Sequence, residues 1–137
     1  MFKNIFGKKE GKIQEDKTQS EEVNKSKVSW IPLTSVDQIA ELKAISKNNH
    51  VAVFKHSTRC IISRTVLQRF EEEFPEGLEV QLYYIDLLNY RDVSLAIADE
   101  FLVVHQSPQL VVIKDEKVVT HASHHDITQI NLEEVIN

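Results

Sequence analysis

The junction between a strand pattern and a helix pattern near residue 60 constrains the fold of this chain most. Residues 50–55 (HVAVFK) are a short run of β-branched and aromatic residues, which is typical of a buried strand. Residues 63–74 follow with three apolar side chains at helical spacing, Val66, Leu67 and Phe70, and end before a proline. A strand followed so closely by a helix is the first half of a strand–helix–strand unit.

The remaining patterns extend this unit to an α/β domain. Helices are predicted at 35–46, 93–101 and 126–136, and further strands at 78–87, 110–113 and 117–121. Strands separated by a helix form a parallel pair through a right-handed crossover, whereas the last two strands form a hairpin. The order therefore predicts a central mixed four-stranded sheet flanked by helices.

Helical spacing also predicts which side chains face the core. In 35–46 these are Val36, Ile39, Leu42 and Ile45, and in 93–101 they are Leu95, Ile97, Ala98 and Phe101. Ser35 and Gln38 have the spacing of a capping box that would start the first helix.

The chain divides near Trp30. Residues 1–29 carry seven lysines against five acidic residues, with few apolar side chains, and are expected to be a flexible charged tail. Residues 30–137 form the predicted domain. The formal net charge of −5 argues against a nucleic-acid surface. Neither a membrane-spanning run nor a secretory signal is apparent, so we expect a cytoplasmic protein without an integral membrane segment.

The chain has a single cysteine, Cys60, which cannot form an internal disulfide. It follows the 50–55 strand by four polar residues, His56, Ser57, Thr58 and Arg59, and a helix begins just after it. The free N–H groups and the dipole at a helix start stabilise a thiolate, and Arg59 and a protonated His56 would add positive charge. A buried structural cysteine is the alternative, but the polar neighbours favour a reactive thiol.

Ser63 stands three residues after the cysteine, where a C-x-x-C oxidoreductase has its resolving thiol. A serine cannot resolve a mixed disulfide, so a thiol from outside must release whatever Cys60 has bound. Ser63 could donate a hydrogen bond to the thiolate, cap the helix, or do both.

Two other features are less specific. Pro108, preceded by Ser107, stands at the start of the 110–113 strand, where either a trans or a cis proline is found. His121, His124 and His125 cluster without acidic or cysteine partners at a fixed spacing, so no metal site is predicted.

The segment FKHSTRCIIS at 54–63 resembles the active site of the YtxJ-type monothiol bacilliredoxins, thioredoxin-fold proteins of the bacillithiol system. The resemblance extends from Trp30 to the end of the chain and includes WIPL at 30–33, YID at 84–86 and QSPQ at 106–109. Members of that family often have T-C-P-I-S where this chain has Arg59 and Ile61 around the cysteine. The loss of the proline is expected to alter the helix start.

The resemblance implies a thioredoxin-like fold and the removal of bacillithiol from S-bacillithiolated client proteins. Cys60 would be the nucleophile, and Ser63 would be the second catalytic residue. Substrate would contact the loop residues His56, Ser57, Thr58 and Arg59, and also Ser107 and a cis Pro108 that faces Cys60. No cofactor would be bound. Bacillithiol would be the cosubstrate, and a flavin-dependent disulfide reductase would restore it.

Two other functions remain open from the sequence. One is a thioredoxin-fold adaptor whose cysteine is incidental. The other is a glutaredoxin-like iron–sulfur carrier, which usually has a glycine after the cysteine (C-G-F-S), where this chain has Ile61.

Overall fold

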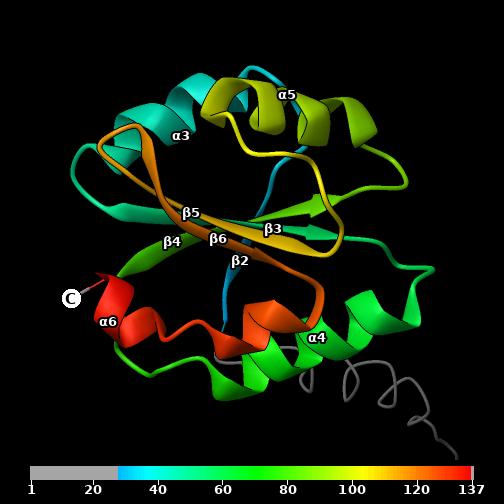
Figure 1. Cartoon of the computed structure of the whole chain (residues 1–137). Helices are drawn as coiled ribbons and strands as arrows, with labels where there is room; N and C mark the ends of the chain where they lie inside the picture. The colour runs from blue at the N-terminus through cyan, green and yellow to red at the C-terminus, as the bar shows by residue number, and fades with distance from the viewer. Residues whose placement is uncertain (1–27, 137) are drawn as a thin grey trace, which may run out of the picture.

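The computed structural model describes residues 28–136. A five-stranded mixed sheet forms the middle layer, in the order β2-β4-β3-β5-β6 (Figure 1). The strands are β2 (Trp30–Pro32), β3 (His50–His56), β4 (Val80–Asp86), β5 (Gln109–Lys114) and β6 (Lys117–Ser123). The pairs β2–β4 and β3–β4 are parallel, whereas β3–β5 and β5–β6 are antiparallel.

The sequence predicted four strands, and the fifth is the edge strand β2. Only three residues long, it is too short to show a two-residue periodicity. Trp30 is held by packing: its ring lies 5.9 Å from that of Phe54 and 5.8 Å from that of Phe70, and its Nε1 donates to Glu71 at 2.7 Å. These partners are remote in sequence, so local patterns do not reveal the strand.

Helices cover both faces of the sheet (Figure 1). On one face lie α3 (Gln38–Ser46) and α5 (Arg91–Phe101), and on the other lie α4 (Ile61–Glu73), the 3-10 helix η1 (His124–Gln129) and α6 (Leu132–Ile136). The central strand β3 supplies both cores because its side chains alternate between the faces. Val51 and Val53 pack with the α3 and α5 side, and Ala52 and Phe54 with the α4 side.

Two predicted core positions are wrong. Val36 is 48% exposed because it lies in a turn before α3, which begins only at Gln38. The Gln38 side chain accepts from the Ser35 N–H at 3.0 Å, as in a capping box, but the Ser35 hydroxyl accepts from the Asp37 N–H instead of the Gln38 N–H. Leu95 is 44% exposed, since the buried side of α5 runs through Val93, Ser94, Ile97 and Phe101.

The closing helix predicted at 126–136 is two separate elements. Ile130 has extended backbone angles (φ −73°, ψ 127°) and interrupts the helix after η1. The side-chain oxygen of Asn131 then accepts from the Glu134 N–H at 3.3 Å, and α6 begins at Leu132. An asparagine cap inside an otherwise periodic pattern therefore marks a second helix start.

The charged tail predicted at 1–29 lies outside the described residues, apart from its last two. Of these, Val28 is buried and packs with Phe70, Phe74 and Ile127. Within residues 28–136, no helix is long and apolar enough to cross a membrane.

Candidate active site

Three connecting segments meet at one edge of the sheet, the edge at which the parallel strands β3 and β4 end (Figure 1). The segments after β3 and β4 leave the sheet together because these neighbouring strands are parallel, and the segment between α5 and β5 returns to the same edge. The Leu87 N–H donates to the His56 carbonyl at 2.9 Å and joins the first two segments. Ligand sites in open α/β sheets form at such edges.

Cys60 is the N-cap residue of α4, as the sequence predicted for its position. Its backbone is extended (φ −103°, ψ 122°), and its carbonyl accepts the Arg64 N–H at 3.0 Å, which is the first turn of the helix. The Cys60 N–H donates to the Ser57 carbonyl at 3.2 Å. The thiol is partly exposed and makes no capping hydrogen bond. The sulfur is therefore accessible, beside free helix N–H groups.

Ser63 lies beneath the loop, fully buried. Its Oγ accepts from the Ser57 N–H at 3.1 Å and lies 2.7 Å from Nδ1 of His56. Among the described residues, its hydrogen-bond partners are thus the end of β3 and the loop, not the Cys60 sulfur. Ser63 ties the strand end to the first turn of α4, an arrangement that the seven-residue separation of Ser63 and His56 hid from the sequence.

His56 is buried at the end of β3, with its ring 5.7 Å from that of Tyr84. Burial lowers the pKa of His56, and Arg64 lowers it further, while Asp86 acts in the opposite direction. The imidazole is therefore neutral at neutral pH. With a neutral ring, either His56 Nδ1–H donates to Ser63, or the Ser63 hydroxyl donates to a bare Nδ1.

The outer part of the loop is open to solvent. Thr58 and Arg59 are exposed and Ser57 is half-buried. Ile61 and Ile62, directly after the cysteine, are 70% and 44% exposed. The sulfur thus lies between an exposed guanidinium and an exposed apolar pair, which together offer a surface for a larger substrate.

The Ser107-Pro108 peptide bond is cis, as the resemblance implied. Pro108 is buried, and its carbonyl accepts from the His124 N–H at 2.9 Å. The Ser107 hydroxyl is buried without a hydrogen-bond partner among the described residues. That Pro108 faces Cys60 remains a prediction.

A buried polar group lies next to the site on the other face of the sheet, and the sequence analysis did not single it out. Lys55 and Gln109 are fully buried, and Ser94 and His105 contact Lys55. The signal was a lysine next to the end of β3, whose residues 51–54 are all apolar and buried.

The three clustered histidines lie in β6 and η1. His121 is exposed on β6, and His124 and His125 are exposed at the start of η1. In residues 28–136, no group of three or more histidine, cysteine or acidic side chains could hold a metal ion.

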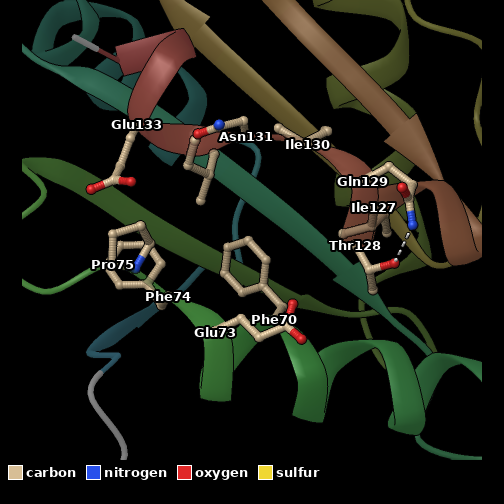
Figure 2. A pocket seen from close by; sticks show the side chains of 11 residues that line it. Phe70, Glu73, Phe74, Pro75, Ile127, Thr128, Gln129, Ile130, Asn131 and Glu133 are labelled. Carbon is tan, nitrogen blue, oxygen red and sulfur yellow. Dashed lines mark hydrogen bonds between the residues drawn. The ribbon is translucent and has the colours of Figure 1, made fainter.

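A pocket of about 340 Å³ lies at the opposite end of α4 (Figure 2). Phe70 and Phe74 reach from α4 toward η1 and α6, where Ile127, Ile130 and Leu132 complete its apolar wall. None of the predicted site residues lines this pocket.

Comparison with known proteins agrees with the fold. The family model described as monothiol bacilliredoxin BrxC matches residues 31–132. A solved structure described as a candidate oxidoreductase with a thioredoxin fold is similar, with 32% identity and a TM-score of 0.66, over 77% of this chain and 92% of its own. Thioredoxin from Fasciola hepatica is 23% identical with a TM-score of 0.58, over 77% and 94%, and shows the fold alone. The predicted thioredoxin-like fold is confirmed, and family and fold together indicate a thiol oxidoreductase.

Proposed function

This chain belongs to the monothiol bacilliredoxin family, and on that premise we propose that it reduces mixed disulfides between client proteins and bacillithiol, or a similar low-molecular-weight thiol. Cys60 is the nucleophile of this reaction. The supporting observation is the position of the only sulfur in the chain, partly exposed at the start of α4 with no second thiol to follow it.

The first step is thiol–disulfide exchange. The Cys60 thiolate attacks the bacillithiol sulfur of the client's mixed disulfide, a new disulfide forms between Cys60 and bacillithiol, and the client leaves as a thiolate that takes up a proton. The client cysteine is thereby reduced, and the oxidised sulfur pair now belongs to this protein and the small thiol.

The second step needs a thiol from outside, because Ser63 stands where a resolving cysteine would. A free bacillithiol thiolate attacks the bacillithiol sulfur on Cys60, releases the Cys60 thiolate and leaves as bacillithiol disulfide. A flavin-dependent disulfide reductase then supplies two electrons to that disulfide. We place the cycle in the cytoplasm, with bacillithiol as cosubstrate and no cofactor bound to this chain.

The surrounding residues divide into two roles. Arg59 is exposed beside the cysteine, and its positive charge favours the approach of anionic groups. Ser63 acts by position: through Ser57 and His56 it fixes the loop that holds the sulfur. We assign substrate contact to Thr58 on the loop, and to Ser107 and Pro108 on the segment before β5.

The test is to follow bacillithiol between two proteins by intact mass. A client with one S-bacillithiolated cysteine is mixed with this protein at neutral pH, without free bacillithiol. We expect the client to lose one bacillithiol and Cys60 to gain it. Addition of free bacillithiol should then clear Cys60.

Cys60→Ser is the negative variant, and Thr65→Ser, an exposed hydroxyl on the same helix, is its matched control. A glutathionylated client, run in parallel, identifies the preferred thiol. If neither client transferred its thiol to Cys60, the result would contradict the proposal and favour the adaptor.

A further inference from the structure

Two polar side chains are buried side by side on the sheet face that α5 covers. Lys55 on β3 and Gln109 on β5 are 0% and 1% exposed. They are direct partners in the antiparallel register, so both side chains point to the same face, with Cβ atoms about 5 Å apart. Neither is part of the exchange chemistry described above.

Each side chain holds one residue of the segment that leads from α5 to Pro108. Lys55 Nζ lies 3.3 Å from Nδ1 of His105 and donates to the Ser94 carbonyl of α5 at 3.2 Å. Gln109 Nε2 donates to the Val104 carbonyl at 2.9 Å. The sheet thus fixes two consecutive residues of this segment from below.

The contact with Lys55 also determines which ring nitrogen of His105 carries the proton. An ammonium group has only donors, so Nδ1 of His105 must accept, and its proton must lie on Nε2. The Ser94 hydroxyl, 3.2 Å from the same nitrogen, can donate to it as well. Burial lowers the pKa of His105, and the charges of Lys55 and Arg91 lower it further, which keeps the ring neutral.

Backbone hydrogen bonds do not fix residues 104–107. In the described part of the chain, they end where the Val103 N–H donates to Ala98 at 3.1 Å and resume at the Pro108 carbonyl. The residues between these points depend on the side chains of Lys55 and Gln109. The path of the chain into the cis proline is therefore set by buried polar contacts.

Burial of the Lys55 ammonium group costs desolvation free energy. No carboxylate of the described residues forms an ion pair with it, and burial lowers its pKa to about 8. An apolar side chain of similar length would avoid this desolvation. A buried amine that forms no ion pair with the described residues is better explained by the residues that it positions than by the stability that it adds.

We propose that Lys55 is a positioning residue, which fixes the segment 102–108 through His105 and Ser94 so that Ser107 and Pro108 are presented to substrate in one conformation. The role rests on the proposed function, since it assigns substrate contact to these two residues. It predicts that Lys55 governs substrate binding and not the reactivity of the sulfur.

The test compares Lys55→Met with Lys47→Met, a surface lysine whose ion pair with Glu116 is exposed. In Lys55→Met we expect backbone order parameters of Val104, His105 and Gln106 to fall from about 0.85 toward 0.6, and the pKa of His105 to rise because a nearby positive charge is lost. Lys47→Met should change neither. These readouts need no substrate and stand even if the proposed function is wrong.

Kinetics with the bacillithiolated client complete the test. Lys55→Met should raise KM about tenfold with kcat within about twofold, and leave the rate of Cys60 alkylation unchanged. His105→Leu should reproduce the KM effect, and the double variant should add nothing to it. Unchanged order parameters in Lys55→Met, or effects of the two substitutions that add, would overturn the proposal.

Discussion

The two ends of α4 differ in what they present. At its beginning, Cys60 holds a partly exposed sulfur on a polar loop, with exposed Ile61 next to it. At its other end, about 20 Å away by the rise of 13 residues, Phe70 and Phe74 line a pocket that contains no cysteine. The chemistry is therefore assigned to a helix tip and not to the pocket in Figure 2.

This difference suggests how the helix is used. A sulfur on an open tip can reach a disulfide on the surface of a large client, whereas the pocket offers no sulfur for such an exchange. The far end of the helix anchors it, because its aromatic side chains pack against η1, α6 and Val28. Substitutions at the two ends should accordingly change different quantities.

Cys60→Ser should have the largest effect. We expect reductase activity to fall by at least about a thousandfold, because no other sulfur can take the bacillithiol. The free energy of unfolding should change by no more than about 0.5 kcal/mol, since the thiol is partly exposed and caps nothing. Client reduction and urea denaturation measure the two quantities, and residual activity above one per cent would break the comparison.

Phe74→Ala tests the opposite end. Phe74 is 7% exposed within the second core, so its truncation should lower the free energy of unfolding by about 3 to 5 kcal/mol. Activity per folded molecule should stay within about twofold, because the sulfur is remote. Leu88→Ala, at an exposed leucine, is the control for stability. A large loss of activity in folded Phe74→Ala would show that the two ends are coupled.

Ser63→Ala removes the link between β3 and the helix start. The substitution leaves the half-buried Ser57 N–H and the buried His56 Nδ1 without their partner, which should cost about 1 to 3 kcal/mol. Activity should fall about tenfold as the loop loses its fixed geometry. Thr65→Ala on the exposed side of α4 serves as the control. Activity equal to the wild type would mean that the serine has no role in positioning the sulfur.

The pH dependence of stability is a smaller effect. The pKa values of His56 and His105 are lowered by burial, so the unfolded chain binds more protons than the folded one below about pH 6.5. Stability should therefore be full above that pH and decline as the pH falls through the unfolded value toward the folded ones. Denaturation midpoints between pH 7.5 and 5.5 measure it, and His56→Gln should reduce the decline. A midpoint that rises on acidification would have the wrong sign.

Glu133→Gln should have the smallest effect. Glu133 is an exposed side chain that lines the pocket. The free energy of unfolding should therefore stay within about 0.5 kcal/mol of the wild type, and the activity within about twofold. A tenfold loss of activity would instead give the pocket a part in the reaction and invalidate the contrast between the ends of α4.

The sequence predicted most of the fold because its strands and helices have strong local periodicity. HVAVFK became β3, and the hairpin and the two long helices follow their apolar spacing. The errors have two causes. Strand β2 depends on distant contacts, the packing of Trp30 against Phe54 and Phe70, whereas the break before α6 depends on a local cap by the Asn131 side chain.

For the site, the position of Cys60 was predicted, whereas the contacts behind it were not. The helix start at Cys60 could be read from the chain because a strand, a polar loop and a helix pattern follow one another. The pairing of Ser63 with His56 could not, since seven residues and a turn separate them. The hydrogen bonds from Lys55 and Gln109 to the 102–108 segment depend on the register between β3 and β5. That register cannot be predicted from a local sequence pattern.

The most direct test of the account is the alkylation rate of Cys60 at pH 7 in the folded chain against the same chain unfolded in urea. The chain has one cysteine, so the label reports a single site. Cys60→Ser combined with Thr65→Cys moves that cysteine to an exposed position inside α4 as a control. Alkylation should be about tenfold faster in the folded wild type than in the unfolded chain, and the control should show no such gain. A folded rate equal to or below the unfolded rate would contradict the claim that the helix start activates this sulfur.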